Sequence, residues 1–533
     1  MATPAEPRDL GLSILGLGTQ YPPYALEPSA LDTLSKRFYP DSPAMQKVLS
    51  INRYTGIDQR SSIGTPDHPL VNQPHPPTIA ELHRIFMSDG VPLAVSAARK
   101  ALAEARVDAA QVTHMVSTTC TDSANPGYDH FVAKQLGLNE TVEKVLLHGV
   151  GCSGGLAALR TAANLCLGHS MRRLPARILV VALEISSTFV RSELESINAL
   201  QETRIGVALF SDCASAALLS NDIPFPSHPA SSPPPPPPIY SLLAWNHRTV
   251  PETDSLLGFD VDPVGWKVVL SPSVPKVAQS VLLPSFTALL SSVPPSCLRP
   301  SSPSLSSPDE AAPDGDGDTY RDPADFDWAM HPGGATILAG AEQALGITPA
   351  HMRASYDRYV RHGNSSSATV LSVLDRLRER EMDELAPPWD HGETRLGGDG
   401  GAKAGAEVAE GRQERGQSNK VREYVVGCAF GPGITVEMCL LRRNLNGRGA
   451  GGVGSGHNCS LGVETPPETE SETSGGSEDG DKGSGGGSER GNQARERGGG
   501  EEAVLQGRPL DSRRLEEEQE AFISKALEEV ELD

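Results

Sequence analysis

The sequence lacks any apolar run long enough to cross a bilayer. No stretch approaches the roughly 18 apolar residues that a membrane span needs, and the N-terminal MATPAEPRDLGLSILGLG has no basic segment followed by a long apolar one, as a secretory leader would. Basic residues are also scarce, because 46 Lys and Arg face 68 Asp and Glu, giving a formal net charge of -22. Acidic surfaces repel phosphate backbones and anionic membranes. We therefore expect a cytoplasmic protein that neither spans a membrane nor binds nucleic acid.

Cysteine pairs are absent as well. The eight cysteines lie far apart, mostly within apolar segments such as NLCLGH and EMCLLR, and no CxxC pair or other metal-ligand spacing occurs. This pattern is typical of reduced thiols in a protein core, and it predicts no metal site. Cys152 is the exception, because glycines surround it.

The chain alternates apolar runs with helix-like segments in two stretches. Residues 10–221 show the alternation expected of strands that lead into helices, and residues 208–219 are expected to form a buried strand. The run SSPPPPPPI then interrupts the pattern, because proline cannot donate to a sheet ladder. A second stretch of similar design covers residues 239–443. We therefore predict an α/β fold built from a duplicated unit, with halves at 1–235 and 236–443.

Three further segments are poor in apolar residues. Residues 294–325 and 383–418 are rich in Ser, Pro, Gly and charge, so we expect loops that emerge from the core. Residues 444–533, with runs such as SGGSEDGDKGSGGGSERG, offer too little apolar surface to offset the entropy cost of ordering. We therefore expect a disordered tail that catalysis does not need, although its residues 512–532 contain strong helix formers.

The strongest local signal is VLLHGVGCSGGLAALRTAANLCLG, in which an apolar strand ends, glycines make a tight turn and an Ala- and Leu-rich helix begins. Cys152 lies at the turn. The free amide groups and the dipole of a helix N-terminus favour a thiolate over a thiol, and glycines let a substrate carbonyl approach the backbone. The motif fits a nucleophilic cysteine, and it fits equally a small buried cysteine at a crowded strand-to-helix corner.

Three other motifs contain residues with catalytic potential. WAMHPGGATILAGAEQAL places His331 at the end of a strand, just before a proline that favours an extended backbone and then starts a helix. In YVRHGNSSSATVLSVLD, Asn364 precedes a helix, where asparagine is a favoured N-cap. CAFGPGITVEMCLLR holds a Gly-Pro-Gly turn between two apolar strands, as a hairpin would. Each motif alone therefore has an ordinary structural explanation.

Together, in this order, the four motifs resemble the type III polyketide synthases, the chalcone-synthase-like branch of the thiolase-fold condensing enzymes. GCSGG at Cys152, HPGG at His331 and GNSSS at Asn364 match the nucleophile, histidine and asparagine motifs of that family. The resemblance covers roughly residues 10–443, and the proline-rich and terminal additions are similar to those of fungal members, which include alkylresorcinol and alkylpyrone synthases. It implies a duplicated thiolase-like fold with αβαβα layers. The family's cyclisation loop is matched by Ala429, which replaces a glycine, and by Phe430, Gly431, Pro432 and Gly433.

The resemblance also implies a mechanism that these residue types can perform. The Cys152 thiolate, paired with a protonated His331, would accept an acyl group from a coenzyme A thioester. His331 and Asn364 would then hold the thioester carbonyl of malonyl-CoA and stabilise the enolate that forms as carbon dioxide leaves. That carbanion would attack the acyl group on Cys152, and the lengthened chain would cyclise to a pyrone or a resorcinol. Acyl-CoA and malonyl-CoA are the implied partners, no metal or bound cofactor is required, and a homodimer is expected.

The substrate pocket is assigned by position within the same resemblance. Phe210 in GVALFSD matches one of two gatekeeper phenylalanines, and counting back from VP at 274–275 places the second at Val268, a smaller residue. Phe259 falls where plant members have a glycine at the cavity floor. The smaller Val268 predicts room for a long fatty acyl starter. The other assignments are Cys120, Ser186 and Phe189 at cavity-lining positions, Asn125 at the dimer interface, and Arg60, with Arg53 as a weaker candidate, at the basic mouth of the coenzyme A tunnel.

Two alternative functions remain open. A ketoacyl synthase that primes fatty-acid synthesis shares the fold and the Cys, His and Asn roles, although the Gly-Pro-Gly loop and the Pro-Gly-Gly after the histidine favour the polyketide branch. A catalytically silent thiolase-fold scaffold could instead recruit partners through its proline-rich insert and acidic tail. The presence of all three catalytic residue types argues against the scaffold.

Overall fold

The computed structural model describes residues 10–225, 236–262, 265–298, 320–387 and 421–445. Most of the proline-rich insert, the central parts of both expected loops, and the tail with its expected helix lie outside the described residues. The disordered tail therefore stays a prediction, as does the division of the remaining chain into two halves. In the part of the chain that the structure describes, no helix is both long and apolar enough to cross a membrane.

Nine strands form one sheet in the order β11-β12-β13-β8-β1-β7-β6-β4-β5. Their bounds are β1 (Leu12–Gln20), β4 (His114–Thr118), β5 (Glu143–Leu147), β6 (Arg177–Ile185), β7 (Asp212–Asn221), β8 (Tyr240–Thr249), β11 (Asp327–Met330), β12 (Tyr424–Gly431) and β13 (Thr435–Arg443). Two small sheets pair β2 (Tyr24–Leu26) with β3 (Arg60–Ser62), and β9 (Leu257–Asp262) with β10 (Gly265–Leu270). Within the large sheet, β1 and β8 are joined by a short antiparallel pairing, in which Ser13 pairs with Ser241 and Ile14 with Tyr240.

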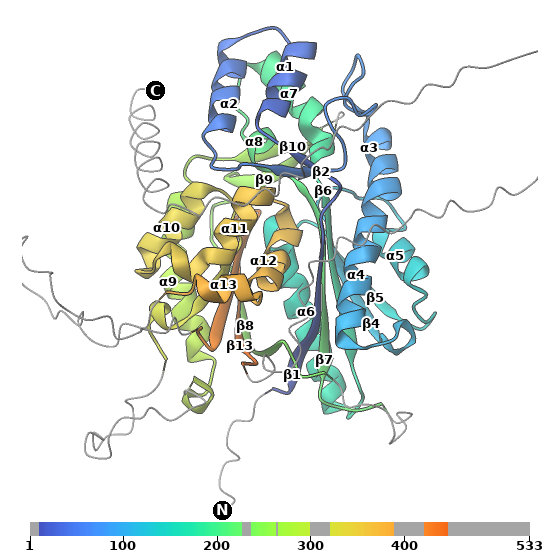
Figure 1. Cartoon of the computed structure of the whole chain (residues 1–533), viewed down its shortest axis with the longest axis vertical. Coiled ribbons are helices and arrows are strands. Elements are labelled where there is room, and N and C mark those ends of the chain that lie inside the picture. Colours follow the sequence, from blue (N-terminus) through green and yellow to red (C-terminus); the bar gives the residue numbers. More distant parts are fainter. Residues whose placement is uncertain (1–9, 226–235, 263–264, 299–319, 388–420, 446–533) are drawn as a thin grey trace, which may run out of the picture. The chain divides into compact units, whose positions relative to one another are not determined.

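The helices are α1 (Ser29–Phe38), α2 (Pro43–Arg53), α3 (Ile79–Ile85), α4 (Val91–Ala105), α5 (Tyr128–Leu136), α6 (Gly154–Met171), α7 (Val190–Leu200), α8 (Gly206–Leu209), α9 (Val274–Ser291), α10 (Ala335–Leu345), α11 (Arg353–His362), α12 (Thr369–Leu377) and α13 (Arg380–Glu384). α4 and α5 cover the outer face of β1, β4, β6 and β7. α6 and α12 pack between these strands and the strands β11, β12 and β13 (Figure 1). α9, backed by α10, covers the outer face of β8 and β13.

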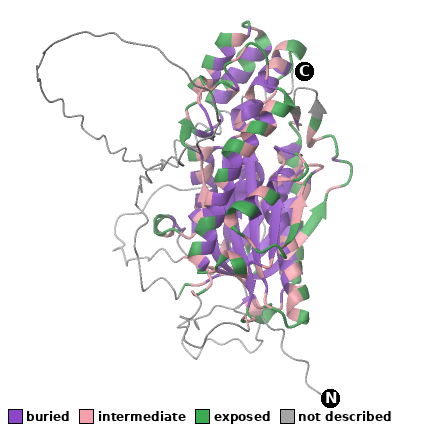
Figure 2. Cartoon of the chain, turned by 90° about the vertical axis from the view of Figure 1, so that its right-hand side faces the viewer, coloured by how far each residue is buried: buried purple, intermediate pink, exposed green. Residues whose placement is uncertain are grey.

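These five layers bury most of the strands on both faces, although the edge strand β5 is partly exposed (Figure 2). Strands buried in this way are expected to be apolar throughout rather than alternating, and β6, with the sequence RILVVALEI, is buried from its second residue to its end. The central apolar cluster contains residues of α6 and α12, of the strands β1, β6 and β7, and of the strands β12 and β13. The α/β class and the αβαβα layers predicted from the sequence are therefore confirmed.

One expected element is wrong. Residues 208–219 do not form a single strand, because α8 ends at Leu209 and β7 begins at Asp212. The Phe210 backbone amide donates to the Gly206 carbonyl (3.0 Å), which closes the helical turn. An uninterrupted apolar run cannot reveal this change, since a buried helix and a buried strand share the same composition. The break places Phe210 in the connection between α8 and β7 rather than inside a strand.

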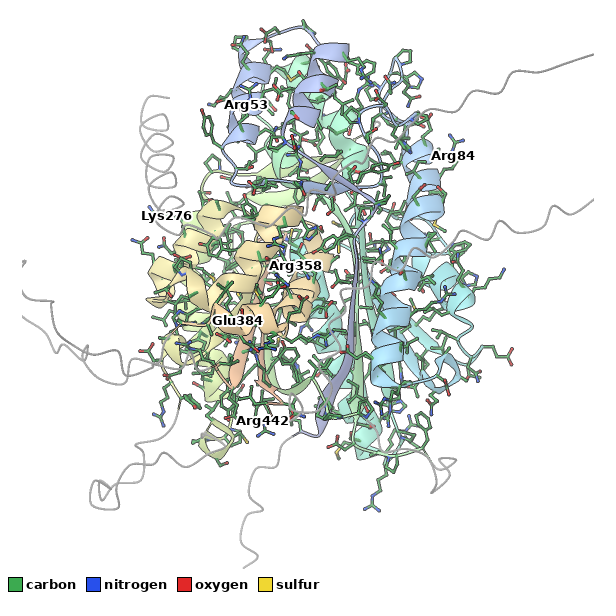
Figure 3. The ribbon with its side chains drawn as sticks, in the orientation of Figure 1. Arg53, Arg84, Lys276, Arg358, Glu384 and Arg442 are labelled. Atoms are coloured by element: carbon green, nitrogen blue, oxygen red, sulfur yellow. The ribbon has the colours of Figure 1, made fainter. Side chains whose placement is uncertain are left out.

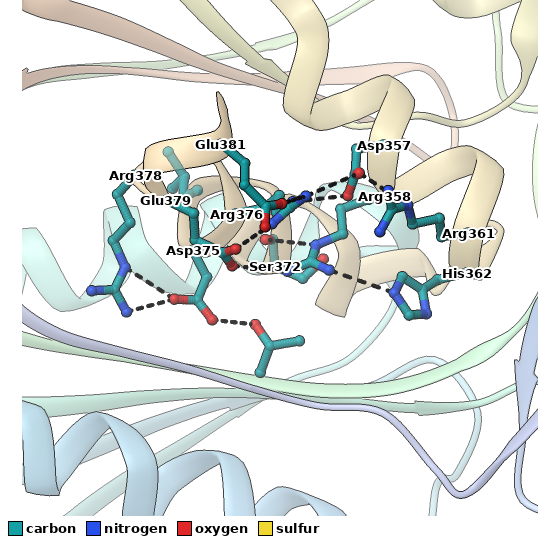
Figure 4. A network of polar contacts seen from close by, with 12 residues as sticks. Asp357, Arg358, Arg361, His362, Ser372, Asp375, Arg376, Arg378, Glu379 and Glu381 are labelled. Atoms are coloured by element: carbon teal, nitrogen blue, oxygen red, sulfur yellow. Dashed lines mark hydrogen bonds and ion pairs between the residues drawn. The ribbon is translucent and has the colours of Figure 1, made fainter. Parts of the chain in front are cut away.

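Ion pairs join the C-terminal helices to one another, and a hydrogen bond joins them to the sheet (Figure 4). Arg376 of α12 pairs with Asp357 of α11 (3.0 Å) and with Glu381 of α13 (2.7 Å). Asp375 accepts a hydrogen bond from the Thr19 hydroxyl of β1 (2.7 Å). α12 is thereby held against β1, which fixes the segment just before it, residues 364–368.

A buried carboxylate ties the last strand to the fold. Asp327 of β11 accepts hydrogen bonds from the guanidinium groups of Arg353 (2.7 and 2.8 Å) and Arg443 (2.8 Å). Burial alone would raise the pKa of Asp327, but the attraction of Arg443 and the bonds from Arg353 outweigh it and lower the pKa below its usual value. β13 is therefore part of the core up to its final residue.

Candidate active site

The nucleophile motif forms the predicted strand, turn and helix. β5 ends at Leu147, a short 3-10 turn, η3, covers Gly151–Ser153, and α6 begins at Gly154. Gly151 has a φ of +51°, which favours glycine because a side chain is strained there. A Cβ at Gly155 would lie 2.5 Å from the Ser367 carbonyl oxygen. The turn that carries Cys152 is thus packed directly on the segment that follows Asn364.

A backbone hydrogen bond positions His331, and a side-chain hydrogen bond brings Asn364 to the same place. The His331 amide donates to the Cys428 carbonyl (2.7 Å), which extends the parallel pairing of β11 with β12. The Asn364 side-chain amide donates to the carbonyl of Gly333 (3.2 Å), two residues beyond His331. The short helix η9 (Ser366–Ala368) has Ser365 as its N-cap. Ser365 is therefore the N-cap by position, but Asn364 Oδ1 accepts the hydrogen bond from the amide of Ser366, the first residue of that helix, as a capping side chain does.

The side chains of this cluster are poorly exposed and have few hydrogen-bond partners among the described residues. Hydrogen bonds link the Cys152 thiol to the side chains of Ser366 and Asn364, and Asn364 Oδ1 accepts from the Ser366 amide (2.8 Å). His331 is 2% exposed, and within the described ranges neither of its ring nitrogens has a hydrogen-bond partner. Both nitrogens are therefore available to a ligand.

Burial opposes charge on both catalytic candidates. It raises the pKa of the Cys152 thiol to about 11, although the bonds from Ser366 and Asn364 act in the opposite direction. It also lowers the pKa of His331 to about 3. Without substrate, a neutral thiol and a neutral imidazole are favoured unless mutual attraction outweighs the desolvation of both ions. The thiolate-imidazolium pair expected from the sequence stays a prediction.

The Gly-Pro-Gly turn lies against the nucleophile turn. It joins β12 and β13, and a Cβ at Gly431 would lie 2.2 Å from the Ser153 hydroxyl. A Cβ at Gly151 would likewise approach Pro432 to 2.7 Å. Ala429, which replaces a family glycine, is a buried residue of β12 paired with Glu437. The replacement therefore falls in regular strand, where no glycine is needed.

A cavity adjoins the cluster and contains five of the predicted pocket residues. It has about 840 Å³ of empty space, part of it open to solvent, with walls from α1, residues 60–71, α7, α8 and the β9–β10 hairpin. Phe210 forms a parallel bridge with Asn364, so this wall of the cavity reaches the catalytic cluster. The rings of Phe210 and Phe259 lie 6.1 Å apart. The five predicted residues in its wall are Ser186, Phe189, Phe210, Phe259 and Val268.

Cys120 lies beside the nucleophile rather than in the wall of this cavity, and its role in lining the substrate pocket stays a prediction. It does not line this cavity, and its sulfur lies 3.3 Å from both the Ser366 hydroxyl and Glu184 Oε2. The two thiols at positions 120 and 152 therefore share Ser366 as a partner. Burial is the main reason why the pKa of the Cys120 thiol is raised well above its usual value.

Glu184 is a candidate that sequence reasoning missed. It is fully buried at the end of β6 and accepts hydrogen bonds from the Cys120 amide (3.1 Å), the Thr121 hydroxyl (3.0 Å) and the Ser367 hydroxyl. Burial raises its pKa, and the bond from Ser367 is the largest of those that oppose the rise. The sequence contains a sign of this role, because Glu184 lies near the end of the apolar run RILVVALEI and a buried acid needs hydrogen-bond partners.

The basic residues do not form the expected tunnel mouth. Arg60 is only 8% exposed, and its guanidinium donates to Asn52 Oδ1 (2.5 Å) and to the Ala208 carbonyl (2.8 Å). It therefore supports the cavity wall from inside. The Arg53 side chain, at the end of α2, is 57% exposed and paired with Asp32 at 2.5 Å (Figure 3). Asn125 is exposed, and its role in a dimer stays a prediction.

Comparisons with known proteins agree with this architecture. Residues 46–223 match the N-terminal domain of chalcone and stilbene synthases, and residues 314–394 match their C-terminal domain. A type III polyketide synthase of Penicillium soppii is 38% identical over 439 residues, which is 81% of this chain and 96% of that protein. The acylalkylpyrone synthase of Aspergillus oryzae is 34% identical over 368 residues, covering 69% of this chain and 87% of that protein. The crystal structure of a type III pentaketide synthase from Neurospora crassa superposes with a TM-score of 0.70 and 63% identity, over 81% of this chain and all of that one.

The five-layer fold and the strand-turn-helix at its centre are those of the thiolase-like condensing enzymes. The chain belongs to the chalcone and stilbene synthase family, as a type III polyketide synthase, and is therefore a decarboxylating acyltransferase. This membership favours the polyketide branch over the ketoacyl synthase alternative.

The packing of Gly155 on Ser367 provides a test of the site. Gly155→Ala should lower the rate of carbon dioxide release from malonyl-CoA about 100-fold, because a misplacement of about 1 Å at a reacting group has that effect. Gly168→Ala on the same helix is the matched control. Nothing lies within 4 Å of its added Cβ, so activity should stay at the wild-type level. Equal activity in both variants would contradict the close packing.

Proposed function

We propose that this enzyme loads a long-chain fatty acyl group onto Cys152, extends it with malonyl-CoA at His331 and Asn364, and cyclises the product to a pyrone or a resorcinol. The observation that carries the proposal is the convergence of three motifs, distant in sequence, on one turn beside an apolar cavity. Each motif alone had an ordinary structural explanation, but a shared location next to a cavity is what a catalytic centre requires.

Loading begins with the Cys152 thiol giving its proton to His331. The resulting thiolate attacks the thioester carbonyl of acyl-CoA, a bond forms between Sγ and the acyl carbon, and the bond to the coenzyme A sulfur breaks. The leaving thiolate takes the proton from His331, which returns to its neutral form. The lowered pKa of His331 opposes the first proton transfer and favours the second, because a weakly basic imidazole gives the proton readily to the leaving thiolate.

Extension uses His331 and Asn364 as hydrogen-bond donors to the thioester oxygen of malonyl-CoA. A neutral His331 carries one N–H, and the Asn364 amide carries two, so both can donate to the thioester oxygen of malonyl-CoA. As carbon dioxide leaves, the electrons of the broken carbon-carbon bond form an enolate that these donors stabilise. The enolate carbon attacks the acyl carbonyl and the Cys152 thiolate departs. Decarboxylation drives the step, so we propose that no metal or bound cofactor is needed.

The cavity supports a fatty acyl starter. Its walls include Leu31, Leu34, Val71, Phe189 and Val207, and each methylene of a lipid chain buried there contributes about 0.8 kcal/mol. Val268 stands opposite Phe259 in the hairpin, where a larger residue would fill the space. The relative named acylalkylpyrone synthase supports an alkyl-bearing product.

We also propose a cytoplasmic homodimer. β5 is the last strand in the sheet order, and among the described residues only β4 pairs with it. An uncovered strand edge is a surface that a second copy of the chain can extend or cover. Seven described cysteines are free, which suits a reducing compartment.

The role of Cys152 is tested by incubating the enzyme with malonyl-CoA and acyl-CoA starters of graded length. Wild type should release cyclised pyrones or resorcinols, and Cys152→Ala should release none, because the thiol that forms the acyl bond is removed. Cys166→Ala, in the buried part of the same helix, is the control and should keep its activity. Product formation near the wild-type rate by Cys152→Ala would remove Cys152 from the mechanism.

The pairing of Cys152 with His331 predicts a pH dependence. Burial is the main reason why the pKa of the thiol is about 11, so without a cationic partner Cys152 would be a reactive thiolate only in alkali. A cationic partner lowers a pKa by about 1 to 3 units. The rate of alkylation by iodoacetamide should therefore rise about one to three pH units lower in wild type than in His331→Ala. Coincident profiles would show that His331 is not the partner.

Starter length tests the cavity. In a competition between coumaroyl-CoA and straight-chain acyl-CoAs, wild type should prefer the long chains in kcat/KM. Val268→Phe should reduce that preference about tenfold, because losing room for two methylenes costs about 1.6 kcal/mol. A wild-type preference for the aromatic starter, or undiminished use of long chains by Val268→Phe, would contradict a fatty acyl tunnel.

A further inference from the structure

The β9–β10 hairpin forms one wall of the acyl cavity. Val268 of β10 lies opposite Phe259 of β9, and both line the cavity together with Phe210. β10 pairs with no strand other than β9 within the described ranges. The distance of Val268 from the opposite wall therefore depends on what holds β10 in place.

Two side chains, rather than a neighbouring strand, bond to the peptide groups of Val268. Glu193 Oε1 of α7 accepts a hydrogen bond from the Val268 amide (3.1 Å). Arg204, in the segment between α7 and α8, donates from Nη1 to the Val268 carbonyl (3.4 Å). Edge strands need partners for such groups when they are buried. Glu193 and Arg204, which we name the β10 clamp, supply them at this one residue.

The clamp is built from charged residues in a poorly solvated place. Glu193 is 2% exposed and the Arg204 side chain 14%. Glu193 Oε2 and Arg204 Nε have no hydrogen-bond partner among the described residues. Burying two charged groups with incomplete pairing costs free energy that apolar residues of the same size would not. The arrangement fixes the position of the backbone of Val268, which lies between Glu193 and Arg204.

Val268 is also confined on its other side. A Cβ at Gly206 would lie 2.8 Å from Val268 Cγ2, so the valine packs directly on the first residue of α8. The same short helix leads into Phe210, which is bridged to Asn364. Val268 is therefore held between the clamp and the element that joins the cavity to the catalytic cluster.

We propose that Glu193 and Arg204 are positioning residues that set the width of the acyl cavity through Val268, and so determine which acyl-CoA starters the enzyme accepts. The proposal rests on the proposed function, because it assumes that the acyl chain occupies this cavity. Neither residue needs to touch the reacting atoms. Their effect is on selection between starters.

The test is a competition between a short and a long straight-chain acyl-CoA, read as the ratio of their kcat/KM values. Glu193→Leu and Arg204→Met should each bring this ratio about tenfold closer to one, because a hydrogen bond to a charged group contributes roughly that factor. Glu193→Gln keeps an acceptor oxygen and should retain most of the wild-type ratio. Glu202→Gln is the matched control, since this exposed carboxylate pairs with Arg204 (3.2 Å) but does not bond to β10.

A double-mutant cycle separates positioning from a general loss of stability. If Glu193 acts through Val268, then adding Glu193→Leu to Val268→Ala should change the ratio less than Glu193→Leu does alone. Wild-type ratios in both Glu193→Leu and Arg204→Met, or independent effects in the cycle, would overturn the proposal. If Glu193→Leu fails to fold, the ratio of kcat/KM values in Arg204→Met alone tests the proposal. A wild type that extends no acyl-CoA would instead refute the proposed function, so the two failures are distinguishable.

Discussion

The constraint on which the rest of the structure depends is the contact between the turn of residues 151–155 and the segment of residues 364–368. At Gly155 the two backbones leave no room for a side chain. Ser366 adopts a φ of +46°, a left-handed conformation that a non-glycine residue reaches only under strain. This conformation accompanies the bond from its amide to Asn364 Oδ1 and the position of its hydroxyl between two thiols. The catalytic cluster is therefore a product of two loops fixed against each other.

The strand β6 and the helices α11 to α13 hold these two loops in place. Glu184 binds the segment of residues 119–121 on one side and Ser367 on the other, so it links β6 to both neighbours of the nucleophile turn. The ion pairs of α11 to α13 fix α12, which follows directly from η9. A site whose donors must meet a developing negative charge benefits from such support, because the donors need not reorganise during the reaction. Burial is part of the same design, since it strengthens each polar contact within the site.

The sequence predicted the features that depend on neighbouring residues. The strand, turn and helix at Cys152 and the hairpin around Pro432 were read from local patterns, and both are present. Contacts between distant residues could not be read in this way. Arg60 was expected at a tunnel mouth, but a carbonyl 148 residues away draws its guanidinium inward. The Glu193 contact spans 75 residues and involves a strand that no pattern indicated. The break between α8 and β7 was hidden within a continuous apolar run.

The central claim is that Cys152 carries the acyl chain and that His331 and Asn364 generate the attacking carbanion beside it. Mass spectrometry of the intact enzyme, followed by peptide mapping, tests this directly after incubation with a long-chain acyl-CoA alone. The account predicts one acyl group per chain on the peptide that contains Cys152. Added malonyl-CoA should consume this group in wild type, whereas it should persist in Asn364→Ala. An adduct on another residue, or its consumption by Asn364→Ala at the wild-type rate, would contradict the account.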